Sequence, residues 1–213
     1  ELYGANLMAG YIGSKAVLLS TTAAEVSGDA DIGGSLLVDT IKADNGTTAM
    51  TIDSNGDVTE SNFELDQWRL ASVFSTDGAT VTGWERVDDA TFSKAGTGMT
   101  ESSGIFTFPR TGLWLVRPEL TIYIDSADGT VGVICNVSSN SGGAYDSVAT
   151  VYEGGDSTAN QMGAISCVIN VTDASTFRFK LTTSSMGSGS QLAADSNTAH
   201  TSILFERKAP PQS

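Results

Sequence analysis

The fold of this chain is set by the stretch Gly104-Ile105-Phe106-Thr107-Phe108-Pro109-Arg110-Thr111-Gly112-Leu113-Trp114-Leu115-Val116. It contains the spacing Gly-x-Phe-x-x-Pro-x-x-Gly and ends in an apolar run. This pattern predicts two consecutive strands, at 104–108 and 112–124. The run Trp84-Glu85-Arg86-Val87 precedes them and is also strand-like.

The remainder of the chain after residue 62 has the same character. Phe177, Phe179 and Leu181 share one face of a predicted strand, because side chains alternate between the two faces of a strand. Ile165, Cys167, Ile169 and Val171 do the same. About nine short strands, and no useful helical period, indicate a β-sandwich or jelly roll. The predicted strands are 67–75, 81–87, 104–108, 112–124, 130–138, 146–152, 160–171, 175–183 and 198–207.

The spacing at 104–116 resembles the signature of the trimeric jelly rolls that include tumour necrosis factor (TNF) and the globular heads of the complement q-type subunits. Trp114 stands at that family's aromatic position, whereas Val116 departs from the pattern by replacing its second aromatic residue. Residues 176–181 and 201–206 resemble the family's last two strands. The resemblance covers about residues 63–208 and implies an all-β, TNF-like jelly-roll knob that forms a homotrimer. The aromatic candidates for its core or interface are Trp68, Trp84, Trp114, Tyr123 and Phe205.

Residues 1–62 have a different content. They lack Trp, Phe, Pro, Arg and Cys, so this segment cannot build a conventional core alone. Two Asn-Gly pairs, at 45–46 and 55–56, lie ten residues apart and predict tight turns between short strands. Such a ladder buries little surface in one chain, so we expect an extended shaft in which identical chains intertwine. Residues 5–24 fit a helical stripe only loosely.

The segments 34–41 and 49–58 resemble shaft segments of bacteriophage fibre and tail proteins. We therefore expect a shaft or attachment segment at 1–62, a knob at 63–208 and a tail at 209–213. The resulting hypothesis is a non-enzymatic virion protein, a trimeric tail fibre or knob that attaches to a host-cell surface glycan or protein. Its N-terminal segment would contact other virion proteins. The alternatives are a decoration, tail or capsid component without a receptor role, and a secreted trimeric TNF-like ligand.

The charge of the chain excludes one class of partner. Eleven basic and 25 acidic residues give a net charge of −14, which repels phosphate backbones, so we expect no nucleic-acid binding. The longest apolar runs are the length of a strand, shorter than the roughly 20 residues that span a bilayer, so we expect no membrane insertion.

Catalytic and metal motifs are weak in this sequence. His200 is the single histidine and no Gly-x-Ser-x-Gly elbow accompanies it, so we predict no enzyme. Paired carboxylates for glycoside cleavage remain the enzymatic alternative. We expect no cofactor, although a structural cation such as calcium stays open, since a hairpin turn explains residues 53–57 better than a calcium loop. Cys135 and Cys167 lie on strand alternations, which favours two buried free thiols over a disulfide.

Binding residues are expected in loops, because loops vary while a sandwich holds them in place. Residues 139–145 combine Tyr with Ser, Asn and Gly, a composition typical of adaptable binding surfaces. The candidate binding residues are Asn140 and Tyr145 in this loop, and Tyr152 and Asp156 in the next. The Gly/Ser run 184–191 is a further candidate. For all three segments the alternative is a plain solvated turn.

Overall fold

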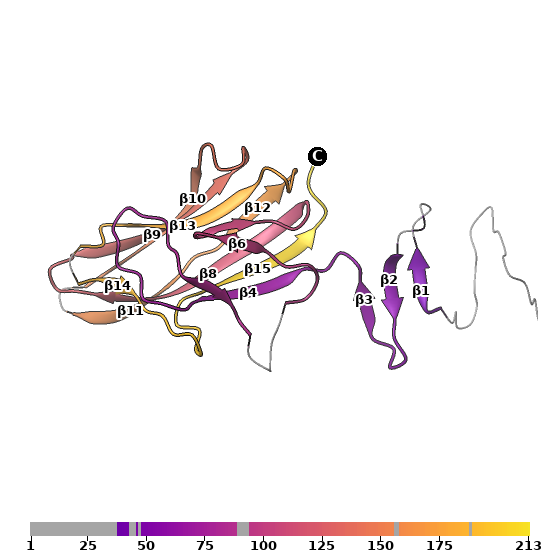
Figure 1. Cartoon of the computed structure of the whole chain (residues 1–213), viewed down its shortest axis with the longest axis horizontal. Coiled ribbons are helices and arrows are strands. Elements are labelled where there is room, and N and C mark those ends of the chain that lie inside the picture. The colour runs from indigo at the N-terminus through magenta and orange to yellow at the C-terminus, as the bar shows by residue number, and fades with distance from the viewer. Residues whose placement is uncertain (1–37, 43–45, 47, 89–93, 156–157, 188) are drawn as a thin grey trace, which may run out of the picture. The chain divides into compact units, whose positions relative to one another are not determined.

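A computed structural model of the chain describes residues 38–42, 46, 48–88, 94–155, 158–187 and 189–213. Every regular element within these ranges is a β-strand (Figure 1). No helix in this part of the chain is long and apolar enough to cross a membrane. The predicted strand signals before residue 38, and the helical stripe at 5–24, lie outside the described residues.

The first three strands form a small antiparallel sheet of their own. They are β1 (Thr40–Lys42), β2 (Thr48–Ile52) and β3 (Val58–Glu60), in that order across the sheet. The turn between β2 and β3 is closed by Asp53, whose Oδ1 accepts hydrogen bonds from the backbone N–H groups of Asn55 and Asp57 at 2.8 and 2.9 Å. These bonds hold the pKa of Asp53 below its usual value. The predicted strand–turn–strand pattern at 51–59 is therefore confirmed.

The remaining twelve strands form two antiparallel sheets packed face to face (Figure 1). The five-stranded sheet has the order β10-β9-β13-β7-β6, and the seven-stranded sheet has the order β11-β8-β15-β4-β5, with β12 and β14 also paired to β8. The all-β jelly-roll prediction is confirmed. The strands are β4 (Leu65–Leu70), β5 (Trp84–Arg86), β6 (Thr100–Ser102), β7 (Ile105–Thr107), β8 (Gly112–Ile124), β9 (Thr130–Ser138), β10 (Asp146–Gly154), β11 (Ala159–Ala164), β12 (Cys167–Val171), β13 (Arg178–Ser184), β14 (Gln191–Leu192) and β15 (Ser202–Ala209).

The predicted single strand at 160–171 is wrong in one respect, because the structure divides it into β11 and β12. Both strands pair with β8 in one continuous register, from Ala159 opposite Ile124 to Val171 opposite Gly112. In that register the break at Ile165 falls opposite Pro118. Proline has no N–H to donate to the ladder, so the only bond there runs from the Ile165 N–H to the Pro118 carbonyl, at 3.2 Å.

Aromatic side chains from six strands fill the space between the sheets. Phe106 of β7 lies 5.0 Å from Phe205 and 5.5 Å from Trp68, measured between ring centroids. Phe108 meets Trp114 of β8 edge to face at 5.3 Å. Four of the five aromatic candidates, Trp68, Trp84, Trp114 and Phe205, therefore lie in the core, whereas Tyr123 lies on the outward face of β8.

The two glycines of the 104–116 pattern are required by close backbone approaches. Gly104 has φ of +82°, and a Cβ there would lie 2.3 Å from the Val81 carbonyl oxygen. A Cβ on Gly112 would lie 2.8 Å from the carbonyl oxygen of Ala209, where β15 carries a bulge against β8. A side chain at either position would push the neighbouring strand away.

A buried ionic network ties β4 to β5 and to the segment around residue 98. Asp66 is 1% exposed, and its Oδ1 accepts from Arg86 Nε at 2.9 Å. Its Oδ2 accepts from Trp68 Nε1 at 2.9 Å and from the Met99 N–H at 2.8 Å. Beside it, the fully buried Glu64 pairs with Arg110 at 2.8 Å. Burial of these carboxylates is tolerated because each is paired or hydrogen-bonded.

This network makes Asp66 the most sensitive charged position of the sandwich. We expect Asp66→Ala to lower the free energy of unfolding by about 3–5 kcal/mol, because it leaves Arg86 without its buried partner. The matched control is Glu119→Ala, whose exposed carboxylate lies 3.9 Å from Arg117, with an expected effect under about 0.5 kcal/mol. Urea unfolding of both variants measures the difference, and equal losses would contradict the assignment.

Candidate functional site

The loop at residues 139–145 joins β9 to β10 and is held by its own side chains. The Oδ1 of Asn140 accepts hydrogen bonds from Ser138 Oγ at 2.8 Å and from the Ala144 N–H at 2.9 Å. Ser138 Oγ in turn accepts from the Gly142 N–H at 2.9 Å. The loop is therefore pre-organised, and the carbonyl oxygen of the Asn140 side chain is already used within it.

Tyr145 lies at the end of this loop, against β13. Lys180 Nζ lies 4.1 Å from the centre of its ring, within the range of a cation–π contact. Burial raises the pKa of its hydroxyl, while the positive charge of Arg178 opposes that rise. The Tyr145 hydroxyl is buried and without a hydrogen-bond partner. The structure thus places Asn140 and Tyr145 in one loop, next to two cationic side chains.

The second predicted loop is different in the structure. Tyr152 lies within β10, not in a loop, and its ring covers Gly132 of the adjacent β9, where a Cβ would lie 2.5 Å from the ring. Its side chain points outward and is 59% exposed. Asp156 lies outside the described residues. The predicted strand at 146–152 is confirmed and extends to Gly154, so Tyr152 does not begin a loop, because the ladder between β9 and β10 continues through Gly154.

The Gly/Ser run 184–191 is only partly a solvated turn. Ser184 ends β13, and Gln191 begins β14. Met186 is 2% exposed, and its N–H donates to Asp77 Oδ1 at 2.9 Å, while the buried Ser190 accepts from the Asp125 N–H. Its described residues are tied to the end of the sandwich, which reduces their value as an open binding loop.

Sequence reasoning missed a concentration of exposed apolar side chains at one edge of the sandwich. Met162 of β11 is 83% exposed and Val168 of β12 is 66% exposed. Both point outward from the seven-stranded sheet, since they pair with Thr121 and Leu115 on the outward face of β8. Val148 and Tyr152 of β10 are also exposed, but β10 belongs to the other sheet. We call Met162 and Val168 the apolar edge. The sequence did carry a signal, an apolar residue at an outward position of each of these strands. Strand alternation alone could not show that these positions lie at one edge of the sheet.

The outward face of the seven-stranded sheet is also apolar over part of its area. Leu113 and Leu115 of β8 and Leu204 of β15 all point away from the core and are half-buried. Val168 pairs directly with Leu115. We call Leu113, Leu115 and Leu204 the apolar face. The outward face of β13 in the other sheet is instead polar, with Arg178, Lys180, Thr182 and Ser184.

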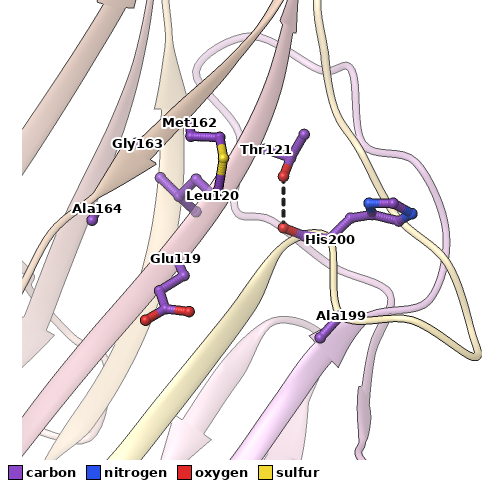
Figure 2. A pocket seen from close by; sticks show the side chains of 8 residues that line it. All are labelled: Glu119, Leu120, Thr121, Met162, Gly163, Ala164, Ala199 and His200. Carbon is purple, nitrogen blue, oxygen red and sulfur yellow. Dashed lines mark hydrogen bonds between the residues drawn. The ribbon is translucent and has the colours of Figure 1, made fainter.

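A shallow hollow of about 590 Å³ lies on the seven-stranded sheet, between β8, β11 and the segment before β15. Met162 and Thr121 line it, and Thr121 Oγ1 donates to the His200 carbonyl oxygen at 2.9 Å (Figure 2). The two titratable side chains of its lining, Glu119 and His200, point in different directions, so they form no acid–base pair (Figure 2). Within the described ranges, no group of three His, Cys, Asp or Glu residues is placed to hold a metal ion. The hollow fits a contact surface better than a reaction centre.

Comparison with known proteins identifies the fold. No family model and no curated protein sequence matches the chain significantly. Among solved structures, a murine APRIL structure at pH 5.0 aligns with a TM-score of 0.53 and 12% identity over 69% of this chain and 100% of that one. An Eiger TNF from S. frugiperda aligns with a TM-score of 0.55 and 13% identity over 71% of this chain and 96% of that one. The TNF-like jelly roll is therefore confirmed as a fold.

The internal bonds of the 139–145 loop generate a prediction. Asn140→Ala removes the acceptor for Ser138 and for the Ala144 N–H, so we expect a loss of about 1–2 kcal/mol in the free energy of unfolding. Hydrogen exchange at the Ala144 amide should also accelerate. Asn197→Ala is the control, because the Asn197 side chain bonds only to Ser196 Oγ at 3.4 Å. An unchanged Ala144 amide would show that Asn140 does not hold the loop.

Proposed function

We propose that this chain is a non-enzymatic attachment protein that acts as a homotrimer with a TNF-like knob. The observation that carries the proposal is the exposed apolar edge on β11 and β12, which continues into the apolar face on the same outward side of the seven-stranded sheet. A contact between unlike surfaces of identical chains closes into a ring when the rotation permits. Because the sequence resembles a trimeric family, we expect the ring to contain three chains.

Burial of these surfaces would supply the energy of assembly. Complete burial of a Met or Val side chain contributes about 1.5–3 kcal/mol. Met162 and Val168 are the two most exposed large apolar residues of the described chain. Most of the free energy that their burial can contribute is therefore available only on assembly. Packing the edge onto a neighbour would also cover the free side of β11 and β12, which are otherwise open to non-specific strand pairing.

The small β1–β3 sheet supports the shaft hypothesis. Its strands expose most of their side chains, including Ile41 and Val58. A sheet of three short strands with little buried surface is marginal by itself. Three copies wound together would share the apolar side chains on a common axis, as the sequence pattern suggests.

Two settings fit a trimeric attachment protein. A secreted TNF-like ligand is favoured by the fold shared with a structure described as an Eiger TNF. A bacteriophage virion fibre is favoured by the β1–β3 ladder and by the resemblance of residues 34–58 to fibre shafts. In both settings three identical knobs present the loop of Asn140 and Tyr145, and weak contacts to a repeated surface ligand add through avidity.

The oligomeric part of the proposal is tested by charge insertion. The wild-type chain should have the mass of three 22.1 kDa subunits, about 66 kDa. The double variant Met162→Asp, Val168→Asp should run near 22.1 kDa, because carboxylates cannot be buried unpaired at the contact. Light scattering measures both masses, and circular dichroism checks that the variant is folded.

The matched control for this experiment is Thr182→Asp, on the polar outward face of the five-stranded sheet. It should leave the wild-type mass unchanged. A wild-type protein that stays monomeric at high concentration would sink the trimer proposal, and dissociation by Thr182→Asp would show that the contact lies elsewhere.

The attachment part is tested with fluorescently labelled protein on intact bacterial cells and on cultured animal cells. Wild-type trimer should bind one of the two panels, and the double variant should bind it at least roughly 100-fold more weakly, because it loses avidity. Binding to bacteria supports the fibre setting and binding to animal cells supports the ligand setting. Binding to neither would favour a structural component without a receptor role.

A further inference from the structure

Cys135 lies at the centre of β9 with its side chain between the two sheets. It is fully buried, and its Cα partners are Ala149 of β10 and Leu181 of β13. It belongs to the same apolar core as Val133 and Phe179. Only a group already inside the sandwich can therefore reach its sulfur.

Cys167 reaches that position from the opposite sheet. It is the first residue of β12, pairs with the inward-facing Val116 of β8, and packs half-buried against the same core. Each thiol shifts the pKa of the other. Both are free thiols in the structure. Two cysteines from facing sheets thus point into one core, one fully buried and one half-buried.

We propose that Cys135 and Cys167 form a redox pair that closes into a disulfide across the sandwich when the protein meets a small disulfide oxidant such as oxidised glutathione. The geometry that carries this is the inward placement of both side chains in one apolar core, on β9 of one sheet and β12 of the facing sheet. The bond would join the five-stranded sheet to the seven-stranded sheet beside the apolar edge.

The chemistry of closure follows from the different exposure of the two thiols. The interaction with Cys135 lowers the pKa of Cys167, and the same interaction together with burial raises the pKa of Cys135. The Cys167 thiolate attacks a sulfur of oxidised glutathione, forms a mixed disulfide and releases one glutathione thiolate. Cys135 then loses its proton, attacks the Cys167 sulfur and displaces the second glutathione. Two protein thiols are oxidised, and one glutathione disulfide is reduced to two thiols.

The disulfide would stabilise the knob. Residues 135 and 167 enclose β10, β11 and the turn between β11 and β12, so cross-linking them restricts the unfolded chain across this whole edge. The residues that carry Tyr152 and Met162 lie within this loop. Oxidation would therefore hold together the strands that form the apolar edge.

Peptide mapping of the wild-type protein tests the proposal. Glu153 is the only glutamate between the two cysteines, so a glutamyl endopeptidase separates them. After incubation of the native protein with oxidised glutathione, a linked peptide pair containing Cys135 and Cys167 should appear, together with an intact mass lower by about 2 Da. Reduction should abolish the pair. Two free thiols, a stable glutathione adduct at Cys167, or bonds between chains would each overturn the proposal.

A thermal measurement gives an independent check. Oxidation should raise the melting temperature by about 7–15 °C, from the loop entropy removed by the cross-link. Cys167→Ser keeps a side chain of similar size and should show no shift after the same treatment. If Cys167→Ser gained stability on oxidation as the wild type does, the stabilisation would not come from this bond.

Discussion

The structure depends on the alternation of β8, the thirteen-residue strand from Gly112 to Ile124. Its even-numbered side chains, including Trp114 and Ile122, are buried between the sheets, whereas the odd-numbered ones face outward. The same strand pairs with β11, β12, β14 and β15, so it fixes the position of nearly the whole seven-stranded sheet. A shift of one residue would exchange the core for the surface, and Gly112 permits the close approach of β15 to the start of β8.

Much of this architecture could be predicted from residue type and spacing. The bounds expected for β8 and β9 agree with the structure, because their alternation is long and their ends are marked by turn residues. The division between β11 and β12 could not be predicted locally, since its cause is Pro118 on a different strand. The short strands β6 and β14 were missed for a different reason: a strand of two or three residues is too short to show an alternating pattern.

The candidate site was less accessible to sequence reasoning. Asn140 and Tyr145 were found by composition and do share a loop, but only the structure shows that Asn140 serves the loop itself. The apolar edge was missed because Met162 and Val168 read as ordinary strand residues. Their exposure is a tertiary property, because only their register with β8 shows that both point outward from the sheet. The proposed trimer therefore depends on what one subunit leaves uncovered, the outward faces of β8, β11 and β12.

Photo-crosslinking from the apolar edge tests this account most directly. A photoreactive phenylalanine analogue at position 162, irradiated in the native protein, should cross-link to a peptide of another chain that contains Leu113, Leu115 or Leu204. Mass spectrometry of mixed isotope-labelled subunits distinguishes bonds between chains from bonds within one. Cross-links confined to a single chain, or to the polar outward face of β13 in another, would contradict the proposed packing of edge against face.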